Sequence, residues 1–209
     1  MTDAAGPNAF EGGREPHLVL VLGDALKILP EIGDRTFGTV LTSPPFQDDD
    51  VPTEYYSWME IVLLQLKRVA EVVVMLNSSR RLVEMCKRFD PSAVLIWDKK
   101  VGMGAFRYES IYIWTKERIW GPGRIWSDTL AFAPIIGKMQ KCKYENPVPL
   151  YHQLLRYFKD FSPVLDPFAG SGTTGLAALQ LGMDCLLIEK DPQTHKIART
   201  ALQLAKEKP

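Results

Sequence analysis

Residues 164–175 read VLDPFAGSGTTG, an apolar run that leads into a turn rich in glycine. The residues that follow, up to Leu181, have the apolar spacing of a helix, so the stretch predicts a strand, a tight turn and a helix. Glycine lets the backbone turn sharply and approach a ligand, and the first turn of a helix presents N–H groups without intrahelical partners. This is the layout of a nucleotide-binding turn at the carboxyl edge of an open α/β sheet.

The kind of nucleotide can be narrowed from neighbouring residues. A P-loop, G-x-x-x-x-G-K-(S/T), needs a lysine after Gly175, and Leu176 stands there, which argues against ATP. A dinucleotide fingerprint also fits poorly, because its opening is usually tighter than Pro-Phe-Ala-Gly. Glu189 ends the next predicted strand, where a carboxylate can accept hydrogen bonds from ribose hydroxyls. S-adenosylmethionine has that ribose and no phosphate; the alternative is a glycine-rich turn with a solvent-facing glutamate.

A second motif, LTSPPF at residues 41–46, follows another apolar run. Proline has no N–H, so this loop offers hydrogen-bond acceptors and few donors, which suits an amine. The Ser43 side chain and the Pro44 carbonyl can hold the amine hydrogens of cytosine or adenine and stabilise the positive charge that develops as the nitrogen attacks a methyl sulfonium. Phe46 would stack on the base, which must be flipped out of a duplex. The alternative is an ordinary Pro-Pro turn.

Apolar runs and helical patterns alternate along most of the chain, which predicts an α/β fold with a mainly parallel sheet covered on both faces. The expected strands are Leu18–Leu22, Phe37–Leu41, Val72–Leu76, Ala93–Trp97, Ser110–Thr115, Val164–Asp166 and Asp184–Glu189. The expected helices are Ala25–Ile32, Tyr55–Val69, one from Ser78 or Ser79 to Arg88, Val148–Phe158, Thr173–Leu181 and one from Asp191 onward.

Composition limits the class of protein. The 209 residues, 46% of them hydrophobic, suit a flexible tail at residues 1–16 and a single domain at residues 17–209. Three cysteines without metal spacing and three scattered histidines predict neither a disulfide framework nor a metal site. No apolar stretch approaches the roughly 20 residues of a membrane span, and we expect a cytoplasmic protein without membrane contacts.

The neutral total charge hides a basic interval. Residues 99–144 contain nine basic and three acidic residues, a net charge of +6, interleaved with aromatic and glycine residues. Such a composition is typical of contacts with phosphates and bases, although a solvated face with core aromatics is the alternative. We therefore expect a short DNA-recognition insertion at residues 99–145, with double-stranded DNA bound by Lys99, Lys100, Arg107, Arg118, Arg124, Lys138, Lys141 and Lys143.

Together the two motifs resemble those of the amino-methyltransferases that modify DNA at cytosine N4 or adenine N6. That family carries (D/N/S)-P-P-(Y/F/W) and D-P-F-x-G-x-G-T, which residues 43–46 and 166–173 match. Because the first motif precedes the second, the order resembles the permuted class called beta. Gly23-Asp24, Trp97-Asp98-Lys99 with Glu109, and Asn146–Pro149 resemble further family motifs, although Val148 replaces a lysine common in the last.

The resemblance implies a Rossmann-like S-adenosylmethionine-dependent methyltransferase fold. Its sheet would have seven strands with the last antiparallel, and the strands ending at Leu41 and Asp166 would be neighbours. The implied catalytic residues are Ser43, Pro44, Pro45 and Phe46. The implied residues around S-adenosylmethionine are Asp24, Asp166, Phe168, Ala169, Gly170, Ser171, Gly172, Thr173 and Glu189.

The resemblance also bears on the target. Ser-Pro-Pro resembles cytosine-N4 enzymes and Asp-Pro-Pro most adenine-N6 enzymes, so Ser43 favours cytosine N4. A C5-cytosine enzyme is excluded because it needs a cysteine after proline, and the three cysteines here follow Met, Lys and Asp. We expect direct transfer; the alternatives are a non-catalytic DNA-binding scaffold and methylation of an RNA or small-molecule amine. The sequence leaves open a homodimer and a cognate endonuclease of a restriction-modification system.

Overall fold

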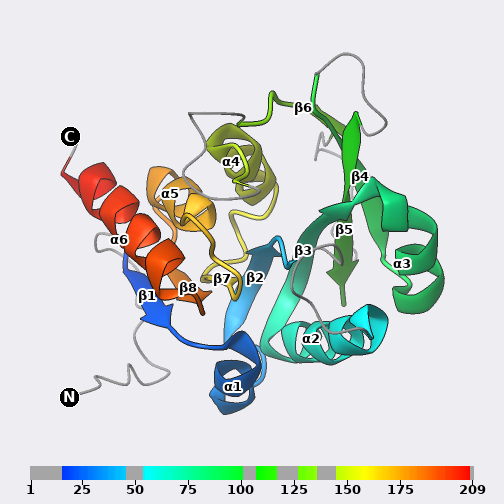
Figure 1. Ribbon diagram of the computed structural model, residues 1–209, viewed down its shortest axis with the longest axis horizontal. Coiled ribbons are helices and arrows are strands. Elements are labelled where there is room, and N and C mark those ends of the chain that lie inside the picture. Colours follow the sequence, from blue (N-terminus) through cyan, green and yellow to red (C-terminus); the bar gives the residue numbers. More distant parts are fainter. Residues whose placement is uncertain (1–15, 46–53, 101–106, 117–126, 136–144, 208–209) are drawn as a thin grey trace.

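The computed structural model describes residues 16–45, 54–100, 107–116, 127–135 and 145–207. Over these residues one eight-stranded sheet lies between two layers of helices (Figure 1). In spatial order the strands are β1-β8-β7-β2-β3-β5-β4-β6. Their bounds are β1 (Leu18–Leu22), β2 (Phe37–Thr42), β3 (Ala70–Ser78), β4 (Ala93–Asp98), β5 (Tyr108–Thr115), β6 (Thr129–Ala131), β7 (Val164–Asp166) and β8 (Cys185–Glu189).

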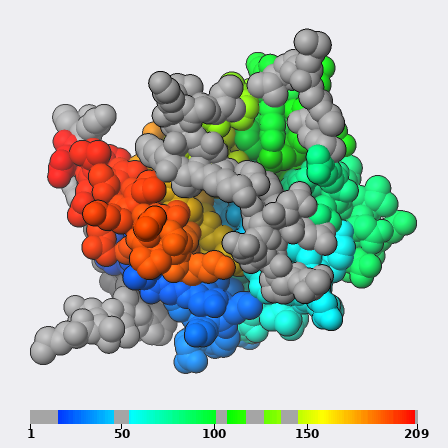
Figure 2. All heavy atoms as spheres, viewed as in Figure 1, coloured from blue at the N-terminus to red at the C-terminus, as the bar shows by residue number. Residues whose placement is uncertain are grey.

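The helices divide between the two faces of the sheet, and each face has its own apolar cluster. One face is covered by α4 (Val148–Tyr157), α5 (Thr173–Gln180) and α6 (Pro192–Lys206). The other is covered by α1 (Ala25–Ile28), α2 (Tyr55–Val69) and α3 (Leu82–Phe89), with short 3-10 helices at Leu29–Glu31 and Ser79–Arg81. In the space-filling view α6, in orange and red, forms one flank, and α2 and α3 form the opposite one (Figure 2).

The strands at the centre of the sheet run parallel, so their carboxyl ends meet at one edge. β2 pairs in parallel with β7 on one side and with β3 on the other. β5 runs antiparallel to both β3 and β4, which puts its first residues at that same edge. The loop after β2 and the glycine-rich turn after β7 therefore leave the sheet from neighbouring strands.

Most of the expected elements are present within a residue or two of their predicted bounds, and Tyr55–Val69 is a helix as predicted. The expected neighbours, the strands ending near Leu41 and Asp166, are paired. The last strand was expected to be antiparallel, but β8 pairs in parallel with β1 and β7, and the antiparallel strand is β5. The number of strands was wrong: the sheet has eight instead of seven. The additional strand, Thr129–Ala131, pairs in parallel with the outer edge of β4, and its three residues are too short to give a periodic signal.

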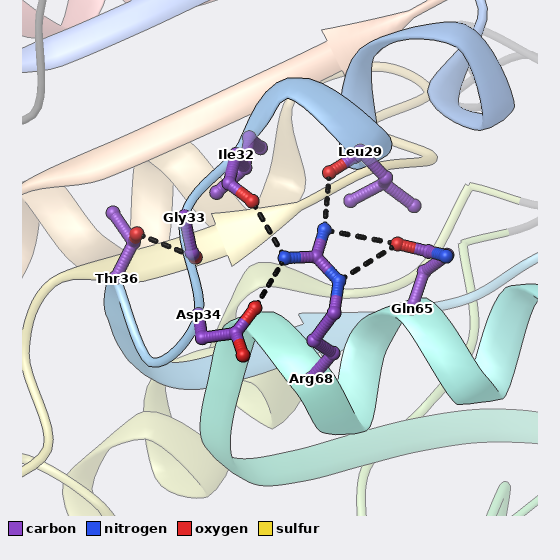
Figure 3. A network of polar contacts seen from close by, with 7 residues as sticks. All are labelled: Leu29, Ile32, Gly33, Asp34, Thr36, Gln65 and Arg68. Carbon is purple, nitrogen blue, oxygen red and sulfur yellow. Dashed lines mark hydrogen bonds and ion pairs between the residues drawn. The ribbon is translucent and has the colours of Figure 1, made fainter.

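Arg68, in the last turn of α2, fixes the connection between α1 and β2 (Figure 3). Its guanidinium donates to the carbonyl oxygens of Leu29 at 2.8 Å and Ile32 at 2.7 Å, and to Asp34 Oδ1 at 2.6 Å. Gln65, one turn earlier, accepts two further hydrogen bonds from it. This set of contacts holds the connection that leads into β2 against α2.

One further property concerns the helices. In the ranges given above, none combines the length and the apolar character needed to cross a membrane.

Candidate cofactor and target-base site

Asp166, at the end of β7, joins the two predicted motifs. Its Oδ1 accepts hydrogen bonds from Thr42 Oγ1 at 2.7 Å and from the Phe168 N–H at 3.1 Å, and its Oδ2 accepts one from Thr174 Oγ1. The Thr174 hydroxyl also lies 3.4 Å from the Leu41 carbonyl oxygen. Because Thr42 ends β2 and Thr174 lies in the first turn of α5, this carboxyl ties the start of the Ser-Pro-Pro loop to the glycine-rich turn.

Burial sets the charge state of this group. Asp166 is 2% exposed, and desolvation raises the pKa of its carboxyl to about 6, against the lowering effect of its three hydrogen bonds. The negative charge of Glu189 raises it further. Hydrogen bonds within the protein occupy both carboxylate oxygens. Asp166 therefore joins β7 to the end of β2, with or without a contact to a cofactor.

The glycines of the turn have different surroundings. Gly170 has φ +53°, and a side chain built there would meet no atom of the described residues within 4 Å, so this backbone faces open space among them. Gly172 has φ +86°, and its missing Cβ would lie 3.3 Å from the Ala198 side chain, so this glycine lets α6 approach closely. Thr173 donates to the Asn146 carbonyl oxygen at 3.3 Å, which brings the segment before α4 to the turn. Ala169 and Ser171 are buried.

Glu189 lies beside this open space. Its Oε2 accepts from the Gly170 N–H at 2.9 Å and its Oε1 from the Asp191 N–H at 2.8 Å. A carboxylate has about four acceptor positions, so each oxygen keeps capacity for one hydroxyl. On the next strand Asp24 caps α1, accepting from the Leu26 N–H at 2.9 Å. A half-buried carboxylate beside an open glycine can accept hydrogen bonds from ribose hydroxyls, so the chemistry of these residues fits S-adenosylmethionine.

The Ser-Pro-Pro loop is described as far as Pro45: Pro44 is buried, whereas Ser43 and Pro45 are half-buried. Tyr151, on α4, is 2% exposed, accepts a hydrogen bond from Asn146 Nδ2 at 2.9 Å and interacts with the Ser43 side chain. Burial raises the pKa of Tyr151, and the charge of Asp166 adds to this, so the hydroxyl stays protonated. Tyr151 was not predicted from the sequence. The apolar pattern of a helix does not show which distant residue, here Ser43, a side chain will contact.

The other predicted residues lie in several places. Phe168 lies with its ring centroid 5.7 Å from that of Trp58 on α2. Lys99, predicted to bind DNA, forms an ion pair with Glu109, and its side chain is 20% exposed. Lys100 and Arg107 are exposed. The predictions for Phe46, Arg118, Arg124, Lys138, Lys141 and Lys143 lie outside the described residues.

Comparisons with known proteins agree with this geometry. The chain is similar to PvuII DNA methyltransferase, whose name describes it as cytosine-N4-specific, with a TM-score of 0.68 and 17% identity over 90% of this chain and 88% of that one. It is also similar to the DNA modification methylase TTHA0409 of Thermus thermophilus in complex with S-adenosylmethionine, with a TM-score of 0.66 and 19% identity over 92% and 97%. The fold is that of S-adenosylmethionine-dependent methyltransferases.

Two sequence comparisons point the same way. Residues 122–200 match the family model N6_N4_Mtase, described as DNA methylase. YubD of Escherichia coli (strain K12), named as a methylase, is 27% identical over 203 residues, covering 87% of this chain and 88% of that protein. The expected methyltransferase fold is thus confirmed, and the expected cofactor agrees with the S-adenosylmethionine bound in a similar structure.

Proposed function

We propose that the protein is a DNA methyltransferase that transfers a methyl group from S-adenosylmethionine directly to the exocyclic amine of a flipped base, with cytosine N4 favoured over adenine N6. One observation carries this proposal: Asp166 hydrogen-bonds Thr42 at the end of β2 and Thr174 at the start of α5. An amine acceptor loop and a cofactor turn therefore start side by side. The match of residues 122–200 to a DNA methylase model supports DNA as the substrate.

S-adenosylmethionine supplies an electrophilic methyl group when it is bound. Glu189 would hold the ribose hydroxyls and the open backbone at Gly170 would receive the cofactor, while Asp24 lies at the end of the outer strand β1 for its adenine. The Pro44 carbonyl and the Ser43 hydroxyl would accept the two amine hydrogens of the base. These acceptors favour a tetrahedral nitrogen and stabilise its positive charge as the new N–C bond forms and the S–C bond breaks. One amine proton then leaves to water.

The remaining parts of the proposal concern DNA and chain order. Lys100 and Arg107 are exposed near the edge that carries the site, where they would contact phosphates. We place the DNA-recognition insertion at residues 99–145 and the acceptor loop before the cofactor turn, as in the permuted class. The Ser-Pro-Pro form of the loop and the similarity to a cytosine-N4-specific enzyme both support cytosine N4.

Two measurements test the function. Isothermal titration with S-adenosylmethionine should give a saturable binding heat; no heat at millimolar cofactor would support a scaffold without catalysis. Incubation with tritiated cofactor and unmodified duplexes of mixed composition should then label the DNA, with a rate that falls as salt rises. Labelling of RNA or of a small amine in place of DNA would overturn the assignment of the substrate.

A third measurement identifies the target base. The mass spectrum of nucleosides released from the labelled duplex should show N4-methylcytosine. Finding N6-methyladenine alone would identify adenine, and not cytosine, as the target base. Ser43→Ala should slow methyl transfer, because the amine loses an acceptor, and should leave cofactor affinity unchanged, because the proposal places no cofactor contact at Ser43. The matched control, Ser92→Ala, removes a hydroxyl between β4 and β5 that bonds Thr115.

A further inference from the structure

A buried glutamate lies at the site's edge of the sheet without a complete set of partners. Glu109 is the second residue of β5, and its side chain is 13% exposed. Its Oε1 accepts a hydrogen bond from Lys99 Nζ, which also lies 5.2 Å from the centroid of the Trp97 ring. Its Oε2 is buried and has no hydrogen-bond partner among the described residues. A native protein rarely leaves such an oxygen unsatisfied, because the desolvation cost is not recovered.

The pairing of the strands places Glu109 at the same edge of the sheet as the acceptor loop. Side chains alternate between faces along a strand, and Leu41 and Ile111 both lie in the cluster under α4, α5 and α6. Glu109 is two positions from Ile111 on β5, so its side chain points to that face. Tyr151 on α4 interacts with the Ser43 side chain, and the charge of Glu109 contributes to raising the pKa of Tyr151. The free oxygen therefore lies on the α4 side of the edge that carries the acceptor loop, with β3 between β5 and β2.

The chemistry of this oxygen restricts its ligand. Burial raises the pKa of the Glu109 carboxyl, and the ion pair with Lys99 acts in the opposite direction by favouring the ionised form. An ionised carboxylate only accepts hydrogen bonds, so the missing partner is an N–H or O–H donor. A cytosine amine is a donor that glutamate accepts in direct base recognition.

We infer that Glu109 is a base-binding residue whose Oε2 shares one hydrogen of the exocyclic amine of the flipped base with the Ser43 hydroxyl, while the Pro44 carbonyl accepts the other hydrogen. This inference rests on the proposed function and adds a determinant of specificity. Cytosine and adenine present an amine at this position, whereas thymine and guanine present a carbonyl oxygen, which the carboxylate repels. Lys99 is the positioning residue that keeps the other carboxylate oxygen occupied.

A binding experiment tests this inference without requiring methyl transfer. Two fluorescent duplexes are identical except for a central cytosine or thymine opposite an abasic position, so either base can flip readily. In the presence of S-adenosylhomocysteine, the wild-type protein should bind the cytosine duplex about tenfold more tightly, the size of one good polar contact to a base. Glu109→Gln should reduce this preference to about twofold or less and slow methyl transfer roughly 10- to 100-fold.

The controls separate base binding from folding. Glu84→Gln removes the carboxylate of an exposed ion pair with Arg88 on α3, and this variant should keep the full preference. Glu109→Gln should keep wild-type affinity for S-adenosylmethionine, since the inference places no cofactor contact there. Equal loss of cofactor affinity and preference would overturn the inference, because it would indicate a general structural role.

A second variant decides the question if Glu109→Gln does not fold. Lys99→Arg keeps the charge but offers a planar fork that can bind both carboxylate oxygens. It should therefore reduce the preference for cytosine, whereas an unchanged preference would overturn the inference. If the wild-type protein labels no duplex at all, the proposed function fails; if it labels DNA and Glu109→Gln keeps the preference, only this inference fails.

Discussion

Replacing Asp166 with asparagine tests the buried carboxyl that joins the two halves of the site. The amide keeps the shape of the side chain: its oxygen can accept from Thr42 and from the Phe168 N–H. Its NH2 group can donate to Thr174, whose own hydrogen then turns to the Leu41 carbonyl oxygen 3.4 Å away. The variant should therefore fold with the same network and without a group that titrates.

The expected effect depends on pH. The pKa of Asp166 rises from an ordinary 3.8 to about 6 in the folded protein, which corresponds to about 3 kcal/mol. Because the folded state holds this proton more tightly than the unfolded state, Asp166 contributes fully to stability below pH 3.8, and the contribution is lost as pH rises through about 6. Asp166→Asn should therefore gain about 2 kcal/mol relative to wild type between pH 4 and pH 7, since part of the contribution is already lost at pH 4.

Urea unfolding, followed by circular dichroism at pH 4 and at pH 7, measures this difference for the two proteins. Subtracting one pH dependence from the other removes the contribution of titrating groups that do not interact with Asp166. Asp191→Asn is a useful contrast, because backbone hydrogen bonds lower the pKa of Asp191 and the exposed carboxylate therefore stabilises the fold as pH rises. Parallel pH dependences for wild type and Asp166→Asn would refute the reasoning.

Three further changes test separate parts of the structure. Arg68→Ala should lower the free energy of unfolding by roughly 2 kcal/mol, because the connection before β2 loses its hydrogen-bond donors; a loss no larger than that of Glu84→Gln in urea titration would contradict this. Gly170→Ala places a methyl group in the open space at a cost of about 1 kcal/mol and should weaken S-adenosylmethionine binding, whereas Gly172→Ala meets α6 and should chiefly lower the melting temperature. Glu189→Gln should weaken cofactor binding roughly tenfold in calorimetry, and unchanged affinity would remove it from the ribose site.

The sequence predicted the parts of the fold that depend on local pattern. The helix Tyr55–Val69 and the strands next to both motifs were visible because their apolar spacing is regular over several residues. Asp191 with Pro192 marked the start of α6, and the Asp191 side chain does accept from the Thr194 N–H at 2.7 Å. The short edge strand Thr129–Ala131 was missed, since its pairing with β4 is decided by tertiary contacts alone.

The candidate site was predictable only as far as its motifs extend. Ser43 and Gly170 belong to strings whose composition already indicates unusual backbone chemistry. No local pattern marks Tyr151 as a site residue, because its role depends on its contact with Ser43, in the loop after β2. The sequence around Glu109 resembles a family motif. Its unsatisfied oxygen and its position beside Lys99, however, depend on the pairing of β4 with β5.

The order of the motifs along the chain matters less to the site than the pairing of β2 with β7. Thr42 and Asp166 are brought together by two parallel strands, and their hydrogen bond does not depend on which strand comes first. β5 lies on the far side of β3, and its first residues are at the same edge of the sheet. This strand can then supply Glu109. Because each of these residues is held by its own strand, the pairing of the strands fixes their relative positions at the edge of the sheet.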